Sequence, residues 1–130
     1  MKPVVVIAAI AASLVSACGE PTVIDQAKKA YLPDCPGHSL GKIVNGYYIA
    51  SMDARTLWTA YPTDDDAIVR ITAEGPILYA GIESKASLEV LYASERDELT
   101  LSGLTINGRA QAYTMAEALV SNMCDKAKGL

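Results

Sequence analysis

The sequence is poor in the residues on which most catalytic chemistry depends. Its 130 residues include one histidine, one tryptophan, three cysteines and no phenylalanine. His38 is therefore the only ordinary candidate for a general base at neutral pH. Ser39, Ser51, Asp34 and Asp53 could nominally complete a hydrolytic triad, but serines and aspartates are too common for this to be a signal. We expect His38 to lie in a surface loop and the protein not to be an enzyme.

Basic residues are also few, with 11 Lys and Arg against 15 Asp and Glu and a net charge of −4. No basic, aromatic-interleaved segment indicates nucleic-acid binding. The acidic run Asp64–Asp66 lacks the alternating ligand spacing, the glycine and the late glutamate of an EF-hand loop. We expect a solvated loop at these acids, and no metal, no cofactor and no nucleic-acid partner.

The apolar N-terminal run, Val4 to Val15, is shorter than the roughly 20 residues that a membrane-spanning helix needs. It follows Lys2 and ends at Val15-Ser16-Ala17-Cys18, which is an aliphatic residue, two small residues and a cysteine. This pattern fits a secretory signal with small residues before the cleavage site. The N-terminus resembles the lipobox signal of bacterial lipoproteins, and the resemblance is confined to residues 1–18.

The resemblance implies that residues 1–17 are a removed signal peptide and that Cys18 becomes a lipid-bearing N-terminus. An aspartate after that cysteine would favour retention in the inner membrane. Gly19 stands there instead, so we expect a periplasm-facing outer-membrane lipoprotein, with an inner or Gram-positive membrane as the alternative. A secreted protein without lipid and a buried N-terminal helix are the other readings of this segment.

Removal of a 17-residue signal leaves 113 of the 130 residues, enough for one compact domain. Cys18 and residues 19–21 form a short tether, because three extended residues span on the order of 10 Å. We expect residues 22–130 to form a single periplasmic domain. Loss of Lys2 takes the net charge from −4 to about −5, so attachment to the membrane rests on lipid rather than on charge.

Because lipid would occupy Cys18, the cysteines Cys35 and Cys124 remain as a pair. Exported proteins enter an oxidising compartment, where paired cysteines form disulfides. We predict a Cys35–Cys124 disulfide, with two free buried thiols as the alternative.

Helix signals stand at the two ends of the predicted domain. Thr22 and Asp25 predict a capped helix start, and Pro33 ends that helix. Thr114 and Glu117 predict a second capping box. The apolar stripe that follows at helical spacing consists of Ala116, Leu119, Val120, Met123, Cys124 and Ala127.

Strand signals fill the region between these helices. Ile43–Ile49 consists of two β-prone runs around Asn45-Gly46, which predicts a hairpin with a tight turn. Thr56–Tyr61 is strand-like in residue type. Residues 64–74 are ambiguous: their apolar alternation favours a strand that Ile77–Gly81 continues, but Thr63 before three acids also resembles a helix start.

A further hairpin is predicted from Leu88–Ala93 and Leu99–Ile106, with a bulge near Ser102-Gly103 because the apolar phase shifts there. Asn107-Gly108 predicts another tight turn. Together these signals predict an α+β fold, an antiparallel sheet of about five to seven strands with an N-terminal and a C-terminal helix packed on it.

Tyrosine and tryptophan are favoured at recognition surfaces because they combine apolar area with a polar tip. Tyr47, Tyr48, Trp58 and Tyr61 follow one another along the predicted first part of the sheet. We take them as the candidate protein-contact surface. The alternative is that they fill the sheet face and its edges.

The sequence therefore favours a lipid-anchored, non-enzymatic envelope protein that binds another envelope protein close to the membrane. Such a protein would be an assembly or exclusion factor of a secretion or conjugation apparatus. The alternative is a periplasmic inhibitor or immunity lipoprotein against a wall-degrading or membrane-active effector, because an acidic domain suits a basic hydrolase.

Overall fold

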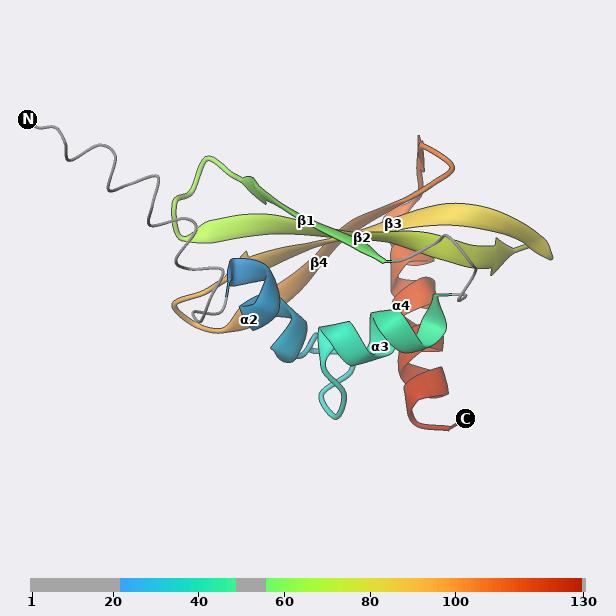
Figure 1. Cartoon of the computed structure of the whole chain (residues 1–130), viewed down its shortest axis with the longest axis horizontal. Coiled ribbons are helices and arrows are strands. Elements are labelled where there is room, and N and C mark those ends of the chain that lie inside the picture. Colours follow the sequence, from blue (N-terminus) through green and yellow to red (C-terminus); the bar gives the residue numbers. More distant parts are fainter. Residues whose placement is uncertain (1–21, 49–55, 130) are drawn as a thin grey trace, which may run out of the picture.

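The computed structural model describes residues 22–48 and 56–129. In these ranges the chain forms a five-stranded antiparallel sheet whose spatial order, β1-β2-β3-β4-β5, equals its order along the sequence. All the described helices lie on one face of this sheet (Figure 1). The elements are α2 (Val23–Lys29), α3 (Leu40–Tyr47), β1 (Leu57–Pro62), β2 (Ile68–Tyr79), β3 (Ile82–Ala93), β4 (Glu98–Ile106), β5 (Arg109–Ala110) and α4 (Tyr113–Ala127). The predicted α+β class is confirmed.

The core lies between the sheet and the helices. Alternate residues of the long strands face it, such as Ile71 and Ala73 on β2 and Leu88 and Val90 on β3, and they are almost fully buried. This alternation follows from the two-residue period of a strand with one covered face. The helices contribute small and aliphatic side chains, namely Ala27, Leu40, Ile43, Val44, Ala116, Val120 and Met123.

The ambiguity over residues 64–74 is resolved in favour of a strand. β2 begins at Ile68 and continues without interruption through Gly75 to Tyr79. The acids Asp64–Asp66 lie in the exposed turn before it, where the Asp65 carboxylate accepts a hydrogen bond from the Ala67 N–H at 2.9 Å.

The predicted bulge in the β3–β4 hairpin is confirmed. Glu89 pairs with Gly103 and Val90 pairs with Leu101, so Ser102 is the extra residue. Its hydroxyl donates a hydrogen bond to the Glu89 carboxylate at 2.8 Å. The bulge lets Leu101 and Leu104 both face the core although three positions separate them.

The predicted hairpin at Ile43–Ile49 is wrong. Leu40–Tyr47 is helix α3, with Ser39 as the N-cap whose hydroxyl accepts a hydrogen bond from the Lys42 N–H at 3.4 Å. Leu40, Ile43 and Val44 recur at helical spacing, and all are buried. That stripe decides the structure, because burial of an apolar helix face outweighs the weak strand preference of single residues. Residue 49 lies outside the described residues.

The N-terminal helix is capped as predicted, with reciprocal hydrogen bonds between Thr22 and Asp25. It ends at Lys29 rather than at Pro33, because Ala30 is already extended. Tyr31 lies beyond the end of this helix, and its side chain is exposed.

The predicted capping box of the C-terminal helix is wrong. α4 begins at Tyr113, its N-cap is Ala112, and no side chain caps it. The predicted stripe nevertheless faces the core, with Ala127 only partly buried at its end.

Cys35 and Cys124 form a disulfide, with their Cα atoms 5.8 Å apart and a sequence separation of 89. The predicted pairing is thus present. It joins the loop before α3 to the buried face of α4. In the chain-entropy treatment, a closed loop of this length stabilises the folded state by about 4–5 kcal/mol.

Candidate contact surface

The four aromatic residues singled out by sequence do not form one surface. Tyr47 and Tyr48 lie at the end of α3, whereas Trp58 and Tyr61 lie on β1. Trp58 pairs with the core-facing Ala73, but Tyr61 pairs with the exposed Arg70. Trp58 and Tyr61 therefore point to opposite faces of the sheet.

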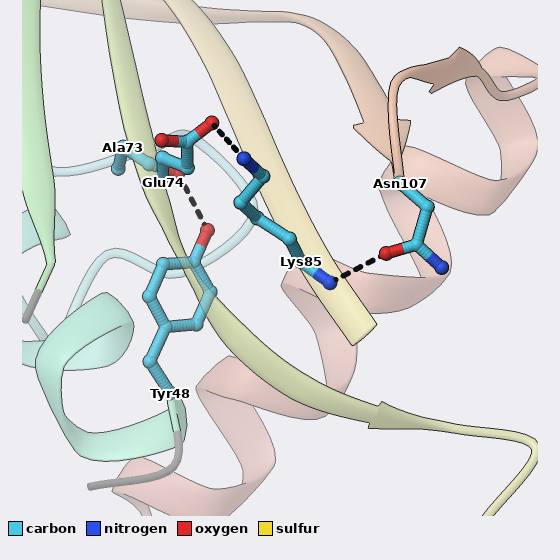
Figure 2. Close-up of polar contacts among 5 residues, drawn as sticks. All are labelled: Tyr48, Ala73, Glu74, Lys85 and Asn107. Atoms are coloured by element: carbon cyan, nitrogen blue, oxygen red, sulfur yellow. Dashed lines mark hydrogen bonds and ion pairs between the residues drawn. The ribbon is translucent and has the colours of Figure 1, made fainter. Parts of the chain in front are cut away.

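Tyr48 does not belong to any contact surface, because its side chain is only 7 % exposed. Its hydroxyl donates a hydrogen bond of 2.7 Å to the Ala73 carbonyl, as Figure 2 shows. Its ring lies against Gly75, where a Cβ atom would overlap the ring atoms. Burial raises the pKa of the Tyr48 hydroxyl well above its usual range. Tyr48 is a core residue that locks α3 onto β2.

Cations accompany the other three aromatic rings. Lys28 Nζ lies 5.2 Å from the ring centroid of Trp58, and Arg70 Cζ lies 5.5 Å from that of Tyr61. Lys126 Nζ lies 5.8 Å from the ring centroid of Tyr47 and so connects α4 with α3. Trp58 and Tyr47 are partly buried against the core, so of the four residues only Tyr61, 43 % exposed, is displayed to solvent.

His38 lies in the loop before α3, half-buried, as expected of a loop residue. Its Nδ1 is enclosed and has no hydrogen-bond partner among the described residues. Ser51 and Asp53 lie outside the described residues. The described part of the chain also holds no group of three or more His, Cys, Asp or Glu side chains that could bind a metal ion.

Exposed apolar side chains concentrate at the turn that joins β2 and β3. Leu78 is 63 % exposed, Tyr79 is 39 % exposed and Ile82 is 69 % exposed. Together with Ala80 and Gly81 they form the uninterrupted apolar segment 78–82, which we call the hairpin tip. β4 pairs with β3 only from Ala86 onward, and β1 pairs with β2 only as far as Glu74. The hairpin tip therefore extends beyond the neighbouring strands of the sheet (Figure 1).

The turn at the hairpin tip contains a residue that does not suit its backbone. Ala80 has φ 54° and Gly81 has φ 80°. The Asn107-Gly108 turn has nearly the same angles, 52° and 82°. Asparagine is common at such positions, whereas alanine in the left-handed region costs about 1 kcal/mol. Ala80 is thus unfavourable for the backbone of this turn, but it makes the turn apolar.

A groove lies beside the hairpin tip. It encloses about 120 Å³ between the tip, the end of α3 and the first half of α4. Tyr47 and Met115 contribute to its walls together with Leu104, Ile106 and Leu119. The apolar tip and this groove form one continuous surface at a single end of the sheet.

The sheet face opposite the helices is more polar than the hairpin tip. No described element covers it (Figure 1). Its central strands present Thr72, Glu74, Ser87 and Glu89, none of them fully buried. Lys85 on this face forms an ion pair with Glu74, with 3.8 Å between Nζ and Oε2 (Figure 2). The tip is therefore the better candidate for an apolar contact.

Sequence reasoning missed Leu78 and Ile82 and read Ile77–Gly81 as an ordinary continuation of the sheet. One signal was present: five apolar residues in a row at a strand end, around an Ala-Gly pair, where a turn usually carries polar residues. What the sequence did not show is that neither the helices nor the neighbouring strands cover this turn.

Cys18, the predicted lipidation site, lies outside the described residues. No described helix has both the length and the apolar character needed to cross a membrane. No protein-family model matches the chain, and the searches of curated proteins and of solved structures found no match either.

Proposed function

We propose that this protein is a lipid-anchored, non-enzymatic envelope protein that docks onto another envelope protein close to the membrane. The observation that carries docking is the hairpin tip, where Leu78, Tyr79 and Ile82 are exposed together. Contiguous exposed apolar side chains beside a groove are typical of interaction sites rather than of free surface.

The anchor is supported by the sequence Val15-Ser16-Ala17-Cys18. Thr22, the N-cap of α2, follows Cys18 by four positions. Four extended residues reach roughly 14 Å, so a lipid on Cys18 holds the domain against the membrane. Gly19, which stands after Cys18 in place of an aspartate, supports an outer-membrane location with the domain in the periplasm.

Anchoring changes the search for a partner from three dimensions to two. A small rigid domain with one apolar protrusion then binds partners in the same membrane, which is the behaviour of an assembly or exclusion factor for a secretion or conjugation apparatus. The Cys35–Cys124 disulfide supports rigidity because it fixes α4 to the loop before α3.

The test is crosslinking in intact cells followed by purification of the full-length protein, with Cys18→Ser as the control. We expect the lipidated protein to recover one partner and Cys18→Ser to recover little of it. Palmitate should label the unsubstituted protein and not Cys18→Ser. Palmitate incorporation into Cys18→Ser would refute the anchor. Absence of any partner for the lipidated protein would refute docking, and a wall-degrading hydrolase as the partner would identify an inhibitor instead of an assembly factor.

A further inference from the structure

We infer that the hairpin tip is a wedge that enters an apolar pocket of a partner protein, and that a basic residue at the rim of this pocket meets Glu83. This inference rests on the proposed function, because it names the part of the domain that docks and the chemistry of the surface it docks into.

The shape of the hairpin tip favours a pocket over a flat surface. Leu78 lies on the sheet face that points away from the helices, since it pairs with Glu83 and follows the core-facing Ile77. Tyr79 and Ile82 pair with each other on the opposite face. A flat partner surface would cover only one of these faces, whereas a pocket that receives the tip covers both.

The composition of the turn supports a contact at its apex. Ala80 and Asn107 occupy equivalent positions in two-residue turns with nearly equal φ values. Asn107 also stabilises its own turn region, because its side-chain oxygen accepts a hydrogen bond from the Lys85 N–H at 2.9 Å (Figure 2). Ala80 does nothing comparable for the fold and adds apolar surface at the apex. Rules of local structure are broken in this way mainly at functional sites.

Charge next to the hairpin tip favours a basic protein over a lipid surface. Glu83 lies directly opposite Leu78, and it takes part in no ion pair within the described residues. The nearby Lys85 is already paired with Glu74. A carboxylate beside the tip, on a chain of net charge −4, disfavours insertion among anionic lipids and suits a Lys or Arg of a partner.

The position of the anchor also favours a protein over a lipid surface as the partner of the hairpin tip. α2 begins near the end of the sheet where β2 starts, and the hairpin tip is at the other end (Figure 1). The 12 residues of β2 span roughly 40 Å, far more than the short segment between Cys18 and Thr22 can reach. A domain anchored at α2 can therefore present its tip away from the lipid, toward the periplasmic parts of other envelope proteins.

The test places a photo-crosslinking amino acid at Ile82 of the full-length lipidated protein in its native envelope. The positional control carries the photo-crosslinking amino acid in place of Glu95 instead. Glu95 lies in the β3–β4 turn, at the opposite end of the sheet (Figure 1). We expect one protein adduct from Ile82 and none from Glu95. The partner peptide captured should be apolar and carry a Lys or Arg.

Reciprocal turn variants separate contact from folding. Ala80→Asn should raise the thermal unfolding midpoint of the purified protein by about 3 °C and reduce the adduct yield at least fivefold. Asn107→Ala should lower the midpoint and leave the yield unchanged. Glu83→Lys should reduce the yield more than Glu83→Gln, because the first change opposes a basic rim and the second only removes the attraction.

Several results would overturn the inference. Lipid adducts alone would mean that the hairpin tip enters a bilayer, and an adduct of twice the chain mass would mean that it meets a second copy. An unchanged yield in both Ala80→Asn and Glu83→Lys would show that neither the apolar apex nor the charge matters. If pull-down with the lipidated protein recovers a partner but Ile82 yields no adduct, docking stands and the tip is the wrong site.

Discussion

The ring of Tyr48 occupies the space that a side chain at position 75 would need. It comes from the end of α3 and reaches across Gly75 to the carbonyl of Ala73 on β2. Because the hydroxyl is hydrogen-bonded and the ring is buried, Tyr48 stabilises the contact between helix and sheet from both its polar and its apolar part. A glycine in the middle of a long strand, otherwise unfavourable, is explained by this close approach.

Gly75→Ala should lower the free energy of unfolding by about 1–3 kcal/mol, because the new methyl group overlaps the Tyr48 ring and the core must shift. The measurement is urea unfolding followed by circular dichroism. Gly103→Ala is the matched control, since a Cβ on that strand glycine has open space around it. Equal unfolding midpoints for the two variants would contradict the role assigned to Tyr48.

The exposure of the four aromatic side chains could not be predicted from the sequence. The residue types of Tyr47, Tyr48, Trp58 and Tyr61 indicate contact, but their exposure depends on which element carries them. Once α3 replaces the predicted hairpin, Tyr48 turns inward, and the alternation of β1 sends Trp58 and Tyr61 to opposite faces. Such orientations follow from the tertiary arrangement and were not contained in the local pattern.

At the scale of elements, the dipeptide Asn-Gly occurs twice and adopts two structures. Asn107-Gly108 forms the predicted tight turn, with both residues at positive φ. Asn45-Gly46 lies inside α3. The difference lies in the flanking residues, because Leu40, Ile43 and Val44 share one face of a helix and are all buried there. The alternating strands, the bulge and the disulfide were predictable, because the apolar phase and the pairing of cysteines favoured each of them over its alternative.

Gly46→Ala tests the helical assignment directly. Gly46 is exposed, and a Cβ there meets nothing, so alanine should stabilise α3 by about 0.5–1 kcal/mol through its higher helix propensity. Gly108→Ala should instead destabilise by about 1 kcal/mol, because residue 108 has φ 82°. Chemical denaturation of both variants gives the comparison. A loss of stability in Gly46→Ala would favour the hairpin over the helix.

At the scale of the whole molecule, two buried tyrosines link stability to alkaline pH. Tyr92 is 2 % exposed, and its hydroxyl donates a hydrogen bond of 2.6 Å to Asp97. Burial, together with the hydrogen bond and charge of Asp97, raises the pKa of Tyr92 from 10.0 to about 12. Burial shifts the pKa of Tyr48 in the same direction.

Below pH 10 both hydroxyls are protonated in the folded and the unfolded chain, so neither contributes a pH dependence. Between pH 10 and about pH 12 they ionise in the unfolded chain only, which stabilises the unfolded state. The free energy of unfolding should fall by up to about 1.4 kcal/mol per pH unit for each tyrosine. Urea titrations at pH 8, 10 and 11 measure this slope, and Tyr92→Phe should remove its share. Equal stability at pH 8 and pH 11 would contradict the raised pKa values of Tyr48 and Tyr92 in the folded protein.

The order of the strands has a kinetic consequence. Every strand pairs with its neighbour in sequence, so the sheet forms through short-range hairpins that close small loops. The contacts of α3 with α4 join segments much further apart in the sequence, and the Cys35–Cys124 bond joins these two regions of the chain. Folding rates rise as contacts become more local. We therefore expect the antiparallel sheet β1–β5 to form first. Oxidation of Cys35 and Cys124 should follow as a late step, after which the folded protein unfolds slowly.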